Sequence, residues 1–441
     1  MQLVAYGAQD VYLTGNPQIT FFKVVYRRHT NFSMESIQQT INGDPGIGKR
    51  VSCNISRNGD LIHKIYLQMK IDFTLGVWED INGNFKPLTI ADDIGHRIIK
   101  YVDLDIGGTR IDRQYGLWME IWSELTITES HKTGYDLLVD GYKPVNVNDG
   151  TEKVTIFKNA ANTQAKTIGD TYNEGVSSRY SENIYVPLQF WFCKNPGLAL
   201  PLIALQYHEV TIHIEFESNN NDALCKKLTY EALKNDNTNP VENILEPIFA
   251  ITASLWVDYI YLDTEERRRF AQVSHEYLIE QIQHTGSEQA NKYSHNLNLN
   301  HPVKELIWVV NNTKETNDYI PQWNIFTGVK TAKVILNGHD RFAERDGDYF
   351  SIVQPYQHHT TIPCAVSDYI ESKHIHCYSF ALKPEEHQPS GTCNFSRIDN
   401  ATLNLTYSDE SSVDHFNVSI FAVNYNVLRI MSGMAGVAYS N

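Results

Sequence analysis

Alternating apolar and polar side chains run along most of this chain and predict β-strands. The segment Leu61–Phe73 shows the pattern most clearly, because every second residue along its centre is apolar or histidine. The residues of this set are His63, Ile65, Leu67, Met69 and Ile71. A period of two places them on one face of a strand, so we expect that face to be buried. Similar alternation recurs to the C-terminus, and it predicts an all-β protein.

Helical patterns are few. Leu117, Ile121 and Leu125 recur at four-residue spacing and predict one helix over Asp112–Leu125. A second, short helix is predicted after Asp263, a residue that caps helix N-termini. Because a strand pattern ends at Leu262 and another begins near Ser274, we interpret this helix as a joint between two β-units.

Two alternating segments in different halves of the chain resemble each other. Val102–Asp112 contains Gly107 and Gly108, and Ala332–Phe342 contains Gly338 after an asparagine. Such pairs favour tight turns with positive φ, so these three glycines are predicted to be structural turn residues.

Later segments repeat the same order. Tyr207–Phe216 precedes the strand that ends at Leu262, and Asn400–Tyr407 precedes Phe416–Ile430. Two similar series in one chain predict an internal duplication.

The pattern divides the chain into five parts. They are an N-terminal arm at 1–24, a first β-unit at 25–263, the helical joint at 264–273, a second β-unit at 274–432 and a tail at 433–441, loose or docked. Polar stretches at about 129–183 and 218–247 are predicted to be long surface loops of the first unit. Apolar strands are predicted at Tyr185–Cys193 and Asn394–Ile398.

Composition narrows the class of protein. A chain of 441 residues fits two domains, and its net charge of −15 argues against a nucleic-acid-binding surface and thus against sequence-specific nucleic-acid binding. The six cysteines form no CxxC pair, which indicates reduced thiols in an intracellular protein. No apolar run approaches the ~18 residues that span a bilayer, and the N-terminus has no signal-peptide pattern, so we expect a soluble cytosolic product.

Candidate chemistry is sparse. Gly43–Arg50 approximates a phosphate-binding loop, but Arg50 replaces the required Ser or Thr and a strand follows instead of a helix. His374 and His376 share a strand face, whereas Cys377 points to the other, so a metal site is not indicated. We predict no cofactor, no metal site and no enzymatic activity.

Seven Asn-x-Ser/Thr sequences occur, which polar, Thr-rich strands generate by chance. Asn311, at the start of a loop predicted over 311–328, is the best exposed glycosylation candidate among them.

Six long segments carry a more specific signal. They are LVAYGAQDVYLTGNPQITFFKVVYRRHTNF, ISRNGDLI, PGLALPLIALQYHEV, WVDYIYLDTEERRRFAQVSHEYLIEQ, QPSGTCNFSRIDNATLNLTY and NYNVLRIMSGMAGVAY. They extend from one end of the chain to the other. The sequence resembles the major capsid proteins of large icosahedral double-stranded DNA viruses of the chlorovirus type.

This resemblance implies a fold and a function. The fold would be two consecutive eight-stranded antiparallel jelly rolls with short helices in the loops. The function would be to form homotrimeric, pseudo-hexagonal capsomers that build an icosahedral shell in the virion, after assembly in the host cell cytoplasm. The partners would be further copies of the chain, minor capsid proteins and the inner membrane beneath the shell.

One alternative stays open. Jelly rolls also occur in lectins, so a carbohydrate-binding or glycan-processing β-sandwich protein is the competing hypothesis. Hydrolysis of a glycan would require two facing carboxylates, and binding would require an aromatic platform in a pocket.

Overall fold

The computed structural model describes residues 8, 11–24, 26–74, 77–79, 85–90, 93–140, 146–148, 152–154, 179–217, 225–227, 248–289, 293–312, 329–363, 374–407 and 416–439. Most of the two predicted long loops lies outside these residues. None of the helices in the described part has the length and apolar character needed to cross a bilayer.

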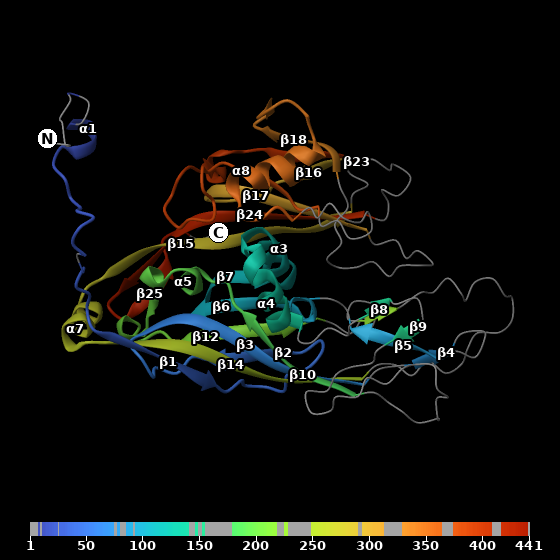
Figure 1. Cartoon of the computed structure of the whole chain (residues 1–441), viewed down its shortest axis with the longest axis horizontal. Coiled ribbons are helices and arrows are strands. Elements are labelled where there is room, and N and C mark those ends of the chain that lie inside the picture. The colour runs from blue at the N-terminus through green and yellow to red at the C-terminus, as the bar shows by residue number, and fades with distance from the viewer. Residues whose placement is uncertain are drawn as a thin grey trace, which may run out of the picture.

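The first β-unit is a pair of antiparallel sheets (Figure 1). One sheet has the order β1 (Phe32–Gln39), β14 (Ile248–Leu262), β3 (Leu61–Thr74) and β10 (Arg179–Pro187), with β11 (Leu200–Pro201) also on β3. The other has the order β2 (Arg50–Asn54), β12 (Val210–Phe216), β6 (Ile99–Ile106) and β7 (Thr109–Tyr115). Their inner faces share one apolar core.

The second β-unit repeats this arrangement. Its first sheet has the order β15 (His275–Gln289), β24 (Phe416–Met431), β17 (Pro302–Asn312) and β21 (His376–Ser379). Its second has the order β16 (Ser294–Asn296), β23 (Ala401–Tyr407), β18 (Val329–Leu336) and β19 (His339–Asp340). Three further strands, β20 (Arg345–Asp346), β22 (Cys393–Asn394) and β25 (Met434–Val437), extend these sheets.

The strand order identifies both units as jelly rolls. When the eight principal strands of each unit are numbered along the chain, both units have the orders 1-8-3-6 and 2-7-4-5. The predicted fold class and the internal duplication are therefore confirmed, since β6–β7 and β18–β19 occupy equivalent places.

Short elements complete the fold. A small sheet combines β4 (Val77–Glu79), β5 (Phe85–Ile90) and β13 (Cys225–Lys227), and β8 (Asn146–Asn148) pairs with β9 (Glu152–Val154). In Figure 1 they lie at the end of the molecule opposite α7. The helices are α1 (Val11–Thr14), α2 (Ile94–Arg97), α3 (Gly116–Thr126), α4 (Glu129–Asp140), α5 (Trp191–Lys194), α7 (Thr264–Gln272) and α8 (Gln354–His358).

Two sequence predictions are confirmed in detail. Ile65, Leu67, Met69 and Ile71 of β3 are all buried in the core of the first jelly roll. Helix α7 is capped by Asp263, whose carboxylate accepts a hydrogen bond from the backbone N–H of Glu266 at 2.9 Å.

The start of the predicted helix at Asp112 is wrong, because residues up to Tyr115 pair with β6 as part of a hairpin. The helix begins at Gly116, where a Cβ atom would meet the carbonyl oxygens of Ile99 at 2.1 Å and His96 at 2.3 Å. Only glycine allows the chain to turn from strand to helix at this position.

Three other boundaries differ from prediction. The strand expected through Cys193 ends at Pro187, whose ring provides no N–H for further pairing, and α5 follows. The strand expected through Ile398 ends at Asn394, whose side chain caps a 3-10 turn over Phe395–Arg397. The polar stretch expected as loop from residue 129 begins with α4.

Candidate assembly surfaces and the seam between the jelly rolls

The described residues contain no group of three or more histidine, cysteine, aspartate or glutamate side chains arranged to hold a metal ion. The thiols of Cys53, Cys193, Cys377 and Cys393 are free, as predicted for these four. The paired histidines His374 and His376 stack on each other, and His376 also stacks on Trp308 at 5.8 Å. Burial holds the pKa of His376 near 3, so it is a neutral core residue.

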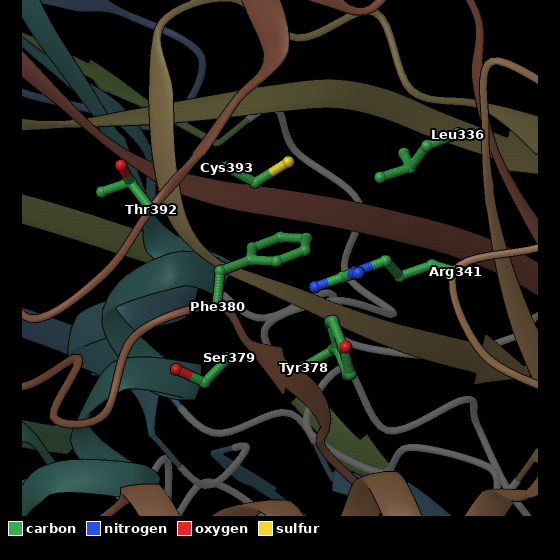
Figure 2. Close-up of a pocket in the computed structure, with 7 residues that line it drawn as sticks. All are labelled: Leu336, Arg341, Tyr378, Ser379, Phe380, Thr392 and Cys393. Atoms are coloured by element: carbon green, nitrogen blue, oxygen red, sulfur yellow. The ribbon is translucent and has the colours of Figure 1, made fainter.

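An open cavity of about 340 Å³ lies on the second jelly roll (Figure 2). Arg341 points into it between Tyr378 and Phe380. Its lining includes no aspartate or glutamate. This cavity therefore lacks the two carboxylates that the glycan-hydrolysing alternative requires.

A further apolar cluster lies at the seam, which is the contact region between the two jelly rolls. Helix α3 of the first roll lies against the β24–β17–β21 sheet of the second (Figure 1). Its buried side chains are Trp118, Ile121, Trp122 and Leu125, and they pack on Ile307, Val309, Ile375, Cys377, Phe421 and Val423. Trp118 is fully buried and its ring lies 5.5 Å from that of Phe421. The seam is thus a third apolar core, built from both rolls.

Hydrogen bonds cross the seam beside this core. Asp112 accepts one from the N–H of Ile282, at 3.2 Å, and Gln281 donates one to the carbonyl of Ile111. Burial raises the pKa of Asp112 to about 6, against the hydrogen bonds that favour its charged form. Because β15 is an edge strand, Asp112 satisfies an N–H that would otherwise be unpaired at the seam.

A buried ion cluster surrounds Glu280. Its carboxylate lies 2.8 Å from the ammonium of Lys304, and 3.8 Å from both Lys194 of the first roll and His387. Burial acts to raise the pKa of Glu280, but His387 and the two lysines outweigh it and lower the pKa to about 2. Lys194 also lies 4.1 Å from the ring centre of Trp122, so it connects the ion cluster to the apolar seam.

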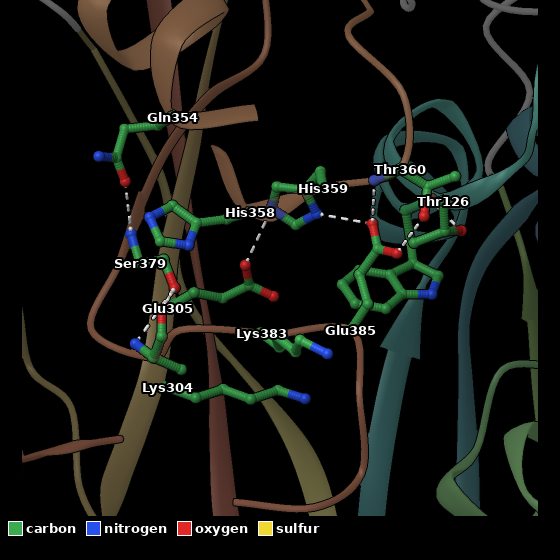
Figure 3. A network of polar contacts seen from close by, with 12 residues as sticks. Thr126, Lys304, Glu305, Gln354, His358, His359, Thr360, Ser379, Lys383 and Glu385 are labelled. Carbon is green, nitrogen blue, oxygen red and sulfur yellow. Dashed lines mark hydrogen bonds and ion pairs between the residues drawn. The ribbon is translucent and has the colours of Figure 1, made fainter. Parts of the chain in front are cut away.

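A second polar cluster surrounds His359 (Figure 3). Its Nε2 lies 3.1 Å from Glu305 and its Nδ1 lies 3.0 Å from Glu385. The side chains of His359 and Glu305 are fully buried. Trp122 of the first roll approaches the imidazole edge-on, with ring centres 6.4 Å apart.

The two rolls also meet at the other end of the seam. The N–H of Tyr207 donates to the carbonyl of Gly433, and the N–H of Ala435 donates to Nδ1 of His208, at 3.0 and 3.1 Å. Leu428 and Ile430 of the second roll lie in the core of the first. The tail is therefore docked: its β25 pairs with β24 and covers the first roll.

Exposed apolar side chains mark two other regions. Five of them belong to the N-terminal arm, which stands apart from both rolls at the α7 end in Figure 1. They are Val11, Ile19, Phe21, Phe22 and Val24, and Phe22 is 98% exposed. Tyr26, just after the arm, is exposed as well. Residues 11–30 contain three lysines and arginines and no acidic residue, so this apolar segment is also basic.

The second region is a helical face of the second roll. Tyr356 and Leu382 are 75% and 74% exposed, and Ile352 and Val353 are also exposed. His358 Nδ1 lies 3.1 Å from the carbonyl of Leu382, which places α8 beside that residue. No sequence pattern pointed to this face, because the turn at Tyr349–Val353 and α8 were not predicted.

The predicted turn glycines lie at equivalent hairpins. Gly107 and Gly108 join β6 to β7 with φ of 60° and 78°, and Gly338 joins β18 to β19 with φ of 76°. Asn311 lies in β17, opposite Asn417 of β24, and is half-buried. Its glycosylation stays a prediction.

Comparison with known proteins assigns the chain to a protein family. The family described as "Major capsid protein N-terminus" matches residues 20–263, and the family described as "Large eukaryotic DNA virus major capsid protein" matches residues 266–436. The chain belongs to the major capsid proteins of large eukaryotic DNA viruses. It is 50% identical to the major capsid protein of Pyramimonas orientalis virus, over the whole chain and 99% of that relative. It is 41% identical to that of Paramecium bursaria Chlorella virus 1, with the same coverage.

Solved structures agree. PBCV-1 VP54 superposes with a TM-score of 0.68 at 36% identity, over 96% of this chain and 100% of that one. The Faustovirus major capsid protein, at 15% identity, shares the fold with a TM-score of 0.67, over 97% of this chain and 94% of that one. The capsid chain is therefore a structural component of a virion. It self-assembles into a shell and is not an enzyme.

Proposed function

We propose that the capsid chain acts as a homotrimer with a pseudo-hexagonal outline. The observation that carries this proposal is the repeated jelly roll, with the same strand order twice in one chain. Three copies of a two-unit chain present six similar corners, which suits a hexagonal lattice. A trimer also requires a head-to-tail contact between two different surfaces of the chain.

Two exposed apolar surfaces, one on each roll, fit that requirement. On the first roll, Phe32 and Met34 of the edge strand β1 are 52% and 49% exposed. On the second, the helical face carries Ile352, Val353, Tyr356 and Leu382. Because these surfaces differ, their mutual burial is a head-to-tail contact and not a two-fold one, and it closes a ring of three when the rotation between copies is three-fold. An obligate interface of this kind buries more than ~2,000 Å².

We further propose a division of the chain for this role. The arm at 1–24 contacts neighbouring copies, minor capsid proteins or the inner membrane beneath the shell. The two jelly rolls at 25–263 and 274–432 form the capsomer body, with the joint at 264–273 between them and the tail at 433–441. Assembly takes place in the host cell cytoplasm.

Light scattering of the purified chain over a dilution series tests the trimer. We expect a stable species near three times 50.5 kDa. Leu382→Asp places a charge in the proposed contact and should yield monomers, whereas Leu138→Asp on α4, which is 41% exposed, should leave the trimer intact. A wild-type chain that stays monomeric at all concentrations contradicts the proposal.

A further inference from the structure

The imidazole of His359 faces a carboxylate on each of its two ring nitrogens, at 3.1 and 3.0 Å. A neutral imidazole can donate only one hydrogen bond and would direct a lone pair at the other carboxylate. Glu305 is fully buried, and within the described residues neither of its oxygens has a hydrogen-bond partner apart from this ion pair. When both carboxyl groups are ionised, the site therefore requires an imidazolium ion.

The residues that follow His359 attach the second roll to the first. Thr360 donates its backbone N–H to Glu385 at 2.8 Å. Thr361 donates its N–H to the carbonyl of Leu125 at 3.0 Å and its hydroxyl to the carbonyl of Ile127 at 2.7 Å. These two carbonyls belong to the last turn of α3 and to the residue that follows the helix, where carbonyl groups have no partner within the helix.

We propose that His359 is a proton-operated latch between the two jelly rolls. While it is protonated, it holds Glu305 and Glu385 together and keeps the strap 359–361 on the end of α3. When it loses its proton, the buried carboxylate of Glu305 loses its ion-pair partner, and the strap is released from the seam. The inference concerns contacts within one chain and does not rest on the trimer.

The charged and titratable groups around His359 set the direction of the effect. Burial opposes its charged form, but Glu305, Cys377 and Glu385 outweigh burial and raise the pKa of His359 well above its ordinary value of 6.5. A raised pKa in the folded state means that the stabilisation is complete below pH 6.5 and is lost as the pH rises through the raised value. The latch is therefore most firmly closed near and below pH 6.5, and it opens progressively as the pH rises from 6.5 through the raised pKa of His359.

The neighbouring groups do not provide this response themselves. Burial raises the pKa of the Cys377 thiol on β21, which keeps it neutral. Lys304 on β17 is paired with Glu280, and Lys383 in the loop before Glu385 is paired with Glu386, each at 2.8 Å. On the α3 side, the group that faces the imidazole is the uncharged indole of Trp122.

Hydrogen–deuterium exchange of the full chain, corrected for the intrinsic pH dependence of amide exchange, tests the latch. We expect the opening of residues 116–127 and 359–362 to increase about tenfold for each pH unit between 6.5 and the raised pKa of His359, and to level off above that pKa. The strands of the two cores should not follow this dependence. A seam whose corrected exchange is constant from pH 6 to about 10 overturns the proposal.

Variants separate the latch from general alkaline instability. The double variant Glu305→Gln/His359→Gln replaces the ion pair by neutral side chains and should abolish the pH dependence of the seam, even if it is less stable throughout. His358→Gln is the matched control, because His358 is adjacent and contacts a carbonyl instead of a carboxylate. It should retain the wild-type response. If the double variant opens in alkali as the wild type does, another group is responsible and the latch is wrong.

Discussion

The two jelly rolls share one strand order but differ in how their cores are closed. Among the described residues, the core of the second roll consists of its own residues, from Leu297 to Ala422. The core of the first roll includes Ile279, Leu428 and Ile430 of the second roll and Ala435 of the tail. The long strands β15 and β24 extend past their own sandwich and cover the first roll (Figure 1).

This difference shows that duplication of a fold does not produce two independent domains. The first roll is completed by the second, and the seam adds a third apolar cluster that neither roll has alone. A capsid component benefits from this arrangement, because a rigid double unit keeps both rolls in a fixed relation when copies assemble. Four experiments test how far the asymmetry extends.

The largest effect is expected at the seam. Trp118→Ala removes a fully buried indole between the rolls and should lower the free energy of unfolding by about 3–5 kcal/mol. Denaturant unfolding should show this loss of stability. The amides of both rolls should also lose protection from hydrogen exchange. Leu138→Ala on the exposed face of α4 is the control, with a change below about 0.5 kcal/mol. An equally small change for Trp118→Ala would mean that the seam contributes little to the free energy of unfolding.

Two leucines with the same burial distinguish the cores. Leu428→Ala and Leu403→Ala each create a cavity at a fully buried site, at a cost of about 2–5 kcal/mol. Leu428 lies in a strand of the second roll but in the core of the first. The strands that pair with it, β15 and β25, contact β7, so its loss should increase amide exchange first in β7 and the adjacent β6. Leu403→Ala should instead loosen β18 and β16. If both variants increase amide exchange in the same roll, the two cores do not differ in the way described.

The equivalent hairpins should respond unequally to alanine. Gly338 has φ of 76° and open space around it, so Gly338→Ala costs about 1 kcal/mol of backbone strain. At Gly107 a Cβ would also lie 2.5 Å from the ring of His208, which accepts a hydrogen bond from Ala435. Gly107→Ala should therefore cost about 2–4 kcal/mol in thermal unfolding. Equal costs would show that the His208 ring can move away.

The smallest effect is expected from Asp112→Asn. The pKa of Asp112 is raised from 3.8 to about 6, so its ionisation costs stability above that range and not below it. Asparagine keeps an acceptor for the N–H of Ile282, and the variant should be more stable by about 1 kcal/mol at pH 7.5. This advantage, measured by denaturant unfolding, should vanish below pH ~4. Asp103→Asn is the contrast, because Asp103 forms an ion pair with Arg113 at 2.5 Å and its loss should destabilise the protein at neutral pH.

Local patterns in the sequence determined much of the fold. The alternation along β3 indicated its buried face, Asp263 indicated the start of α7, and the paired turns near Gly107 and Gly338 indicated the duplication. These features depend on residues that are close in sequence, so a period, a cap or a required positive φ reveals them. The family resemblance added the jelly-roll topology.

The contacts at the seam depend on the tertiary structure alone. Nothing in the pattern of α3 indicates that Trp118 and Trp122 face another roll and not their own, because a helical stripe records that a face is buried but not what buries it. The same holds for His359, Glu305 and Glu385, which are separated along the chain. Only the fold brings each carboxylate within 3.1 Å of a ring nitrogen of His359. The partners then hold the pKa of His359 above its ordinary value against the effect of burial, because a charge that is removed from water depends on the groups that the fold places beside it.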